Sequence, residues 1–231
     1  MPKYLLVSFE TCPWVQRAAI VLREKNIDFE FRHITPDNRP DWFLAISPHK
    51  KVPVLRVDDK VSLFESNAIA EFLEETTPAP RLHPADPVQR AINRAWNDYV
   101  PTFATIMTGR AYSVSEADYT KSVEQIPAAF ARLEEALTKQ NSGPFFNGKD
   151  YSLVDASYAP FLQRYFYLER IKPLSLIDKY PRLKAWAEAL VARPSTHSFP
   201  PEKFEAMYRD VVKRRKTWVS QFIAPAAEAA E

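Results

Sequence analysis

The chain of 231 residues lacks several features that would mark particular classes of protein. It has a single cysteine, so no disulfide can form within it, which suits a reducing compartment. Its apolar runs, such as residues 4–7 and 18–22, are far too short to cross a bilayer. No charged segment followed by an apolar stretch opens the sequence, so no secretory signal is visible. We therefore expect a cytoplasmic protein that does not bind a membrane.

An excess of charge of one sign is missing as well, because 31 Lys and Arg residues stand against 29 Asp and Glu residues. This balance gives no electrostatic reason to expect a nucleic acid as a partner. The sequence also has no phosphate-binding loop, dinucleotide fingerprint or serine nucleophile elbow. Its histidines are scattered without the spacing of metal ligands, which predicts that there is no metal site. They are His33, His49, His83 and His197.

What the chain does have is an ordinary globular composition, with 46% hydrophobic and 26% charged residues. Strand and helix patterns alternate over its first eighty residues. The patterns predict a βαβ unit followed by a helix, a hairpin and a last helix, which together form an α/β domain over residues 1–78. The strands are expected at 3–8, 28–34, 52–57 and 61–64, and the helices at 13–25, 41–46 and 66–75.

A proline-rich break follows this domain. Residues 76–87 contain four prolines, which remove backbone donors and block helix, so we predict a linker over residues 79–87. No strand alternation follows the break. The remaining patterns predict an all-helical domain over residues 88–231, ending in a tail of low complexity after Ile223. Its helices are expected at 88–112, 115–141, 152–168, 181–192 and 202–222.

The single cysteine, Cys12, lies where the first strand gives way to the first helix. Because proline is favoured at the first helical position, Pro13 predicts that Cys12 is the cap and faces unpaired N–H groups. The helix dipole contributes about 0.3 to 1 kcal/mol and a backbone hydrogen bond to a charged group roughly 1.5 to 3 kcal/mol. Together they would lower a thiol pKa of about 8.5 to about 6.5. The plain alternative is a small buried hydrophobic side chain.

Val15 stands where a dithiol oxidoreductase would carry its second cysteine. Any disulfide chemistry at Cys12 therefore needs an external thiol to complete it.

Five segments in register carry a resemblance to a known family. The chain resembles the cytosolic glutathione S-transferase superfamily, and within it the cysteine-type omega and dehydroascorbate reductase branches. The resemblance implies a thioredoxin-like N-terminal domain, an all-α C-terminal domain, a homodimer, and glutathione as cosubstrate with no metal. The segments are residues 12–17, 39–46, 47–55, 64–69 and 147–160.

The resemblance also implies how glutathione would be bound. Val52, before a cis Pro53, would pair main chain to main chain with the cysteinyl part of glutathione. Ser66 would bind the γ-glutamyl carboxylate, and Glu65 the ammonium group. The residues alone indicate only a proline at the start of a strand and a serine that caps a helix. Arg39 and Lys51 are basic candidates for the glycine end, with solvated loop cations as the alternative.

Aromatic side chains at helical spacing could line an acceptor cleft between the two halves, although such a pattern is more often core. The candidates are Trp14, Trp96, Tyr99, Phe103 and Tyr112, with Phe204 and Tyr208 able to close the cleft. Ser152 and Asp155 fit a capping box with a structural role. Lys50 departs from the family pattern, which has a glycine in that loop, and this leaves the subclass open.

The predicted activity is thiol transfer. Cys12 would attack a glutathione mixed disulfide, an oxidised acceptor or a glutathionyl carbon adduct, and a second glutathione would release the product. Dehydroascorbate, small disulfides and glutathionyl ketones or quinones are plausible small electrophilic or oxidised acceptors. A glutathionyl-hydroquinone reductase or an ether-cleaving lyase is an enzymatic alternative. A non-catalytic binding or regulatory protein of the same fold is the alternative of another class.

Overall fold

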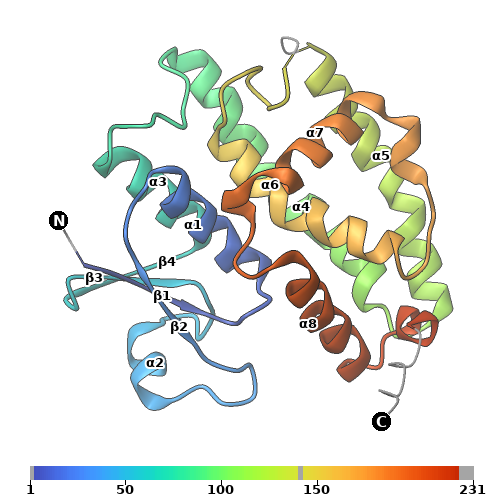
Figure 1. Ribbon diagram of the computed structural model, residues 1–231, viewed down its shortest axis with the longest axis horizontal. Coiled ribbons are helices and arrows are strands. Elements are labelled where there is room, and N and C mark those ends of the chain that lie inside the picture. The colour runs from blue at the N-terminus through green and yellow to red at the C-terminus, as the bar shows by residue number, and fades with distance from the viewer. Residues whose placement is uncertain (1–2, 140–142, 224–231) are drawn as a thin grey trace.

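The computed structural model describes residues 3–139 and 143–223. A four-stranded sheet forms one end of the molecule, with two helices above it and a short helix on the opposite side (Figure 1). The strands are β1 (Tyr4–Ser8), β2 (Glu30–His33), β3 (Val54–Val57) and β4 (Val61–Phe64), and the helices are α1 (Pro13–Glu24), α2 (Asp41–Ile46) and α3 (Ser66–Thr76). These elements confirm the predicted thioredoxin-like α/β fold.

The order of the strands in the sheet is β2-β1-β3-β4. β1 pairs in parallel with β2 and antiparallel with β3, and β3 and β4 form the predicted hairpin. All five residues of β1 are buried, which explains why this strand appears in the sequence as a continuous apolar run. Because β1 lies inside the sheet, the loop that follows it delivers Cys12 to the edge where the helical half packs.

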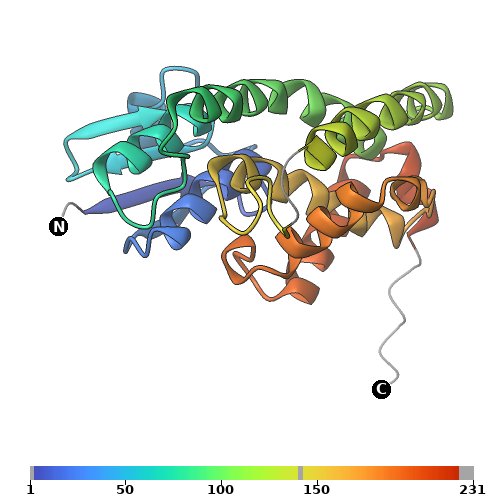
Figure 2. The same ribbon diagram turned by 90° about the horizontal axis from the view of Figure 1, so that it is seen from above.

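The second half is helical, as predicted. Its α-helices are α4 (Pro87–Tyr112), α5 (Glu116–Lys139), α6 (Leu153–Glu169), α7 (Pro181–Ala192) and α8 (Pro201–Arg214), and its 3-10 helices are η1 (Leu176–Lys179), η2 (Pro194–Thr196) and η3 (Trp218–Phe222). Figure 2 shows α4 and α5 running along one side of the molecule. No helix among the described residues is long and apolar enough to cross a membrane. The predicted low-complexity tail lies outside the described residues.

Helix α6 occupies the centre of this half, and almost all its residues are buried. It begins with the predicted capping box, in which the backbone N–H of Ser152 donates to Asp155 Oδ2 at 2.8 Å. Trp186 also donates its indole N–H to Asp155 Oδ1 at 2.6 Å. The cap therefore fixes α6 against α7, and α6 in turn packs against α1 across the boundary between the two halves.

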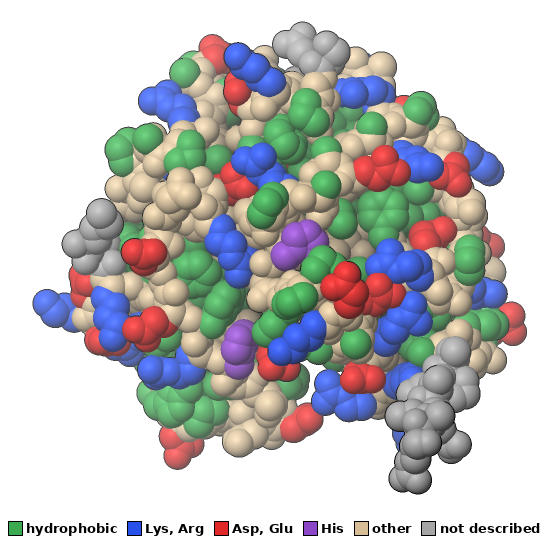
Figure 3. Space-filling view, viewed as in Figure 1, with side chains coloured by type: hydrophobic (Ala, Val, Ile, Leu, Met, Phe, Trp, Pro, Cys, Tyr) green, Lys and Arg blue, Asp and Glu red, His purple; other side chains and the backbone are tan. Residues whose placement is uncertain are grey.

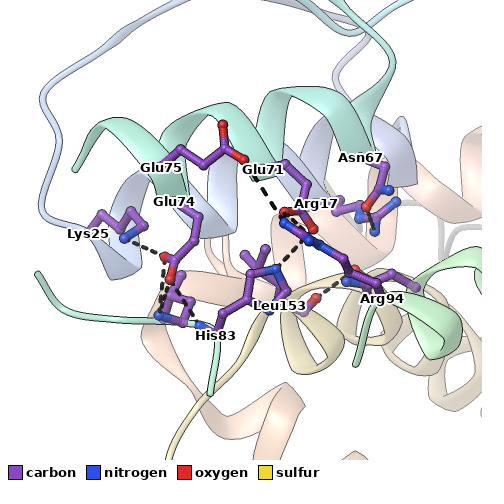
Figure 4. A network of polar contacts seen from close by, with 12 residues as sticks. Arg17, Lys25, Asn67, Glu71, Glu74, Glu75, His83, Arg94 and Leu153 are labelled. Carbon is purple, nitrogen blue, oxygen red and sulfur yellow. Dashed lines mark hydrogen bonds and ion pairs between the residues drawn. The ribbon is translucent and has the colours of Figure 1, made fainter. Parts of the chain in front are cut away.

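The segment between α3 and α4 has no helix or strand, but side chains hold it against the first half. Lys25 Nζ, at the end of α1, donates to the carbonyl oxygens of Thr77 and Pro80 at 2.7 and 2.9 Å. The same ammonium group pairs with Glu74 at 2.6 Å (Figure 4). The predicted division at residues 78 and 88 stays a prediction, although the two ends of this segment match it closely.

Candidate active site

Cys12 is the cap residue of α1, as predicted, and Pro13 is the first residue of the helix. Its backbone is extended, with φ −74° and ψ 120°, and its N–H donates to the carbonyl of Phe9 at 3.1 Å. Its side chain accepts no capping hydrogen bond, although the backbone N–H groups of Val15 and Trp14 lie near enough to influence the pKa of the thiol. The thiol is half-buried and packs against the main hydrophobic core.

The pKa of Cys12 differs from the sequence expectation. Burial raises the pKa of the thiol above its ordinary value of 9.0, and the N–H groups of Val15 and Trp14 and the charge of Arg164 lower it by less. The expected pKa of about 6.5 counted only the favourable start of a helix. It left out the loss of hydration that follows when the second half of the chain packs over α1.

A pocket of about 390 Å³ opens beside the first turns of α1. It is bounded by α1, the loop before β3, the junction of β4 and α3, and α4. Six predicted site residues line it, namely Trp14, Lys51, Val52, Pro53, Glu65 and Ser66. The bond between Val52 and Pro53 is cis, as the resemblance implied. The structure therefore brings together most of the residues proposed for glutathione.

The junction of β4 and α3 differs in detail from the prediction. Ser66 is the first residue of α3 and not its cap, because Glu65 occupies the cap position. Glu65 has φ 64°, a left-handed conformation that is costly for a residue with a side chain and that recurs at binding sites. Its carboxylate lies 3.0 Å from His49 Nδ1. The start of α3 therefore faces the pocket with free backbone donors, an arrangement that favours a carboxylate ligand.

Sequence reasoning missed several side chains of this pocket. Arg17 is almost fully buried, and its guanidinium donates to Asn67 Oδ1 at 2.6 Å. Burial lowers the pKa of Arg17 to about 10, so it stays charged at neutral pH. Its helical position, one turn after Trp14, which lines the same pocket, was the available signal. The other missed residues are Ser47, His49, Phe64, Asn97, Asp98 and Pro101.

Arg39 lies outside the residues that line the pocket. It is exposed, and its guanidinium donates to the carbonyl oxygen of Lys50 at 2.8 Å. Lys50 has φ 53°, in the left-handed region that favours glycine, which explains why the family pattern has a glycine there. Arg39 therefore braces the loop that leads to Val52.

The predicted acceptor residues do not form one group. Trp14 lines the main pocket, whereas Tyr112 lines a second, narrower cleft together with Pro13, Arg164 and Tyr208. Phe103 is fully buried and packs against Tyr158 with ring centroids 5.1 Å apart, so it belongs to the core. The half-buried rings of Trp96 and Tyr99 pack against each other and the core, outside both pockets. Phe204 is likewise buried, 5.2 Å from Arg164.

We also searched the described side chains for a metal-binding cluster. Within residues 3–139 and 143–223, no group of three or more His, Cys, Asp or Glu residues is placed to hold a metal ion. On the face seen in Figure 3, basic and acidic side chains are interspersed, and a notch separates the part that carries α2 from α8. The two clefts beside α1 are therefore the candidate sites for chemistry.

Comparison with known proteins identifies the family that shares this arrangement. The family model described as glutathione S-transferase, N-terminal domain, matches residues 6–81, and the corresponding C-terminal domain model matches residues 116–189. Glutathione S-transferase omega-1 of Sus scrofa is 30% identical over 188 residues, covering 81% of this chain and 76% of the relative.

Solved structures agree with these matches. A tau class glutathione S-transferase from mango superposes with a TM-score of 0.80 at 28% identity, covering 90% of this chain and 98% of the other. Rice GST1, solved in complex with glutathione, superposes with a TM-score of 0.79 at 27% identity, covering 92% and 97%. The two domain matches, the omega-1 relative and the shared fold show that the chain belongs to the glutathione S-transferase family.

Proposed function

We propose that this chain is a glutathione-dependent thiol transferase in which Cys12 forms a mixed disulfide with glutathione. One observation carries the proposal: Cys12 is the cap residue of α1, where the backbone N–H groups of Val15 and Trp14 act to lower the pKa of its thiol. A thiolate at the start of a helix is stabilised by such donors and is the nucleophilic form of cysteine. The glutathione-bound rice relative supports glutathione as the cosubstrate.

The main pocket offers a complementary group for each part of glutathione. In this proposal the main chain of Val52 pairs with the cysteinyl part, and the start of α3 at Ser66 receives the γ-glutamyl carboxylate. Glu65 takes the ammonium group, and Lys51 lies towards the glycine carboxylate. A volume of about 390 Å³ suits a ligand of this size, since small-molecule pockets span about 300 to 1,000 Å³.

The reaction has two balanced exchanges. The Cys12 thiolate attacks the glutathionyl sulfur of a mixed disulfide, so a Cys12–glutathione disulfide forms and the acceptor sulfur leaves as a thiolate that takes a proton from water. A second glutathione thiolate then attacks the same glutathionyl sulfur. Glutathione disulfide leaves, and Cys12 returns as thiolate. Each cycle consumes one free glutathione, whose thiol does the work of a resolving cysteine, because the chain has no second cysteine.

The other parts of the proposal follow from the family. The omega relative favours cysteine chemistry, whereas the tau class neighbour leaves room for conjugation in which a hydroxyl activates glutathione. Attack of the same thiolate on a glutathionyl carbon adduct would make the protein a hydroquinone reductase or a lyase. A homodimer and a cytoplasmic location belong to the same proposal.

Two measurements test it on the whole chain. The purified protein should be retained on immobilised glutathione and should reduce 2-hydroxyethyl disulfide with glutathione. Cys12→Ala should keep retention and lose turnover, and the parent should gain the mass of one glutathionyl group after mixing with glutathione disulfide. Full activity in Cys12→Ala contradicts the assigned nucleophile, and retention without turnover in the parent favours a binding protein.

A further inference from the structure

Arg164, in α6, is a buried cation beside the start of α1. Only 5% of its surface is exposed. Its Nη2 donates to the carbonyl oxygen of Thr11 at 2.7 Å, and its Nη1 donates to Gln16 Oε1 and to the carbonyl oxygen of Pro160 at 2.8 and 2.6 Å. All three acceptors are neutral, and no carboxylate accepts from it among the described residues. A buried charge without a charged partner is costly, so this arrangement needs a reason.

The bonds of Arg164 hold both sides of Cys12. Thr11 precedes the cysteine, and the backbone N–H of Gln16 makes the first helical bond back to the Cys12 carbonyl at 3.1 Å. The side chain of Gln16 is fixed in turn, because its Nε2 donates to Gln163 Oε1 at 2.8 Å and to the carbonyl oxygen of Thr196 at 2.7 Å. The cysteine turn is thereby anchored to α6 and η2, although neither belongs to the thioredoxin-like half.

One donor of Arg164 is left over. Its Nε is buried and has no hydrogen-bond partner in the structure. The side chain lines the narrow cleft that Pro13, the residue after Cys12, also lines. The rings of Phe204 and Tyr208 lie 5.2 and 5.9 Å from the guanidinium carbon and offset part of the cost of burial. A spare donor and an uncompensated positive charge therefore lie beside the turn that carries Cys12.

We propose that Arg164 is a positioning residue that fixes the turn of Thr11 and Cys12 and supplies the positive charge opposite the Cys12 thiolate. The proposal rests on the proposed function, in which this thiolate is the nucleophile. Arg164 then opposes the effect of burial on Cys12, and the negative charge that forms on the sulfur is the missing partner of the guanidinium. The second half of the chain thus both shields the thiol and makes its ionisation possible.

The other titratable groups around Arg164 are tyrosines. They are Tyr112 from α4, Tyr167 from α6 and Tyr208 from α8. Burial raises the pKa of Tyr167 to about 12 and also raises the pKa of Tyr208. Burial lowers the pKa of Arg164 itself. The variants below therefore change the charge at Arg164 and leave these tyrosines in place.

The test measures the rate of iodoacetamide alkylation from about pH 6 to about pH 11 in the whole chain, whose single cysteine makes the labelled site unambiguous. Arg164→Gln should move the midpoint to higher pH and slow alkylation about tenfold at pH 8, because a nearby opposite charge shifts a pKa by about one unit or more. Arg164→Lys keeps the charge and should keep the midpoint.

Arg23→Gln is the matched control. Like Arg164, Arg23 is an arginine that links α1 to the second half of the chain, since it donates to the carbonyl oxygen of Ser195 at 3.0 Å. It lies in α1 itself, about 16 Å along the helix from Cys12. Its midpoint should match the parent. An equal shift in this control, or in Arg164→Lys, would overturn the role of the charge at Arg164.

A folded Arg164→Gln protein with the parent midpoint also overturns the proposal. Should Arg164→Gln fail to fold, Gln16→Glu decides the question, because it leaves the guanidinium in place and puts a carboxylate against it. That variant should raise the pH midpoint of alkylation, and an unchanged midpoint would contradict the proposal. Since alkylation needs no glutathione, its result is independent of whether Cys12→Ala abolishes thiol transfer.

Discussion

Two groups of charged side chains in this molecule are built differently. The linker cluster consists of Lys25, Glu71, Glu74, His83 and Arg94, and its charges are paired (Figure 4). Lys25 meets Glu74 at 2.6 Å, His83 meets Glu71 at 2.9 Å, and Arg94 meets Glu71 at 2.8 Å. The site arginines, Arg17 and Arg164, have hydrogen bonds only to amide side chains and backbone carbonyls.

The difference separates structure from chemistry. In the linker cluster each charge is compensated inside the chain, so the cluster holds the segment between the halves and has nothing left for a ligand. The site arginines are compensated only in part, and both line a cleft beside α1. We infer that paired buried charges here serve stability and that partly satisfied ones await an anion. The predictions below test that division.

The largest effect is expected where a paired charge loses its partner. Glu74→Gln leaves Lys25, whose side chain is fully buried, without a carboxylate. Breaking such a pair costs about 3 to 5 kcal/mol of the free energy of unfolding, measured by urea denaturation. Glu75→Gln is the matched control on the same helix, because its carboxylate is exposed and 4.0 Å from Arg94, and it should change stability by about 0.5 kcal/mol or less. Equal losses would contradict the comparison.

Acid should remove a second part of the stability of the linker cluster. Burial by itself would raise the pKa of Glu71, but bonds from His83 and Arg94 outweigh it and lower the pKa to about 2. Because the folded pKa lies below the unfolded value, this stability is present above about pH 4.5 and is lost as pH falls towards 2. The shift corresponds to about 3 kcal/mol.

Glu71→Gln isolates that contribution. Measured by urea denaturation, the free energy of unfolding of the variant should be lower than that of the parent at pH 6. This difference should disappear as pH approaches 2, because the parent carboxylate is then protonated as well. A gap that persists unchanged at pH 2.5 would mean that the loss comes from packing and not from the charge.

The site arginines should show the opposite balance of effects. Arg17→Gln removes a cation that has only Asn67 as a partner, so no buried carboxylate is orphaned and the loss of stability should be about 1 kcal/mol. Binding of glutathione should weaken about tenfold, measured by calorimetry, because the pocket then lacks a positive charge for an anionic ligand. A variant that is strongly destabilised but binds normally would move Arg17 into the structural group.

Local signals in the sequence were enough to predict most of the helices and strands and the position of Cys12. Pro13 places Cys12 at a cap because proline suits the first helical position, and Ser152 with Asp155 marks the start of α6 for a similar reason. Such signals act within a few residues, so the elements and the position of the nucleophile follow from them. The family pattern supplied Val52, Glu65 and Ser66, which the structure gathers at one pocket.

What the sequence could not supply depends on contacts between distant residues. Arg164 reaches Thr11 across 153 positions, and no periodicity records such a pair. Lys25 is a residue type that is usually exposed, and only the return of the linker buries it. Phe103 has the helical spacing of a cleft residue and of a core residue alike, and packing against Tyr158 decides for the core. The same tertiary burial changed the expected pKa of Cys12.

The smallest expected effect concerns the reactivity of Cys12 in the parent protein. Because burial raises the pKa of its thiol, the alkylation midpoint should lie above 9.0 when the pocket is empty. Below the midpoint the rate should rise about tenfold per pH unit, since only the thiolate reacts. At pH 7.4 the thiol should therefore react somewhat more slowly than a free cysteine, with a peptide thiol as the matched standard. A midpoint near 6.5 would mean that the N–H groups of α1 and the charge of Arg164 outweigh burial, and that the thiol is ionised before any substrate arrives.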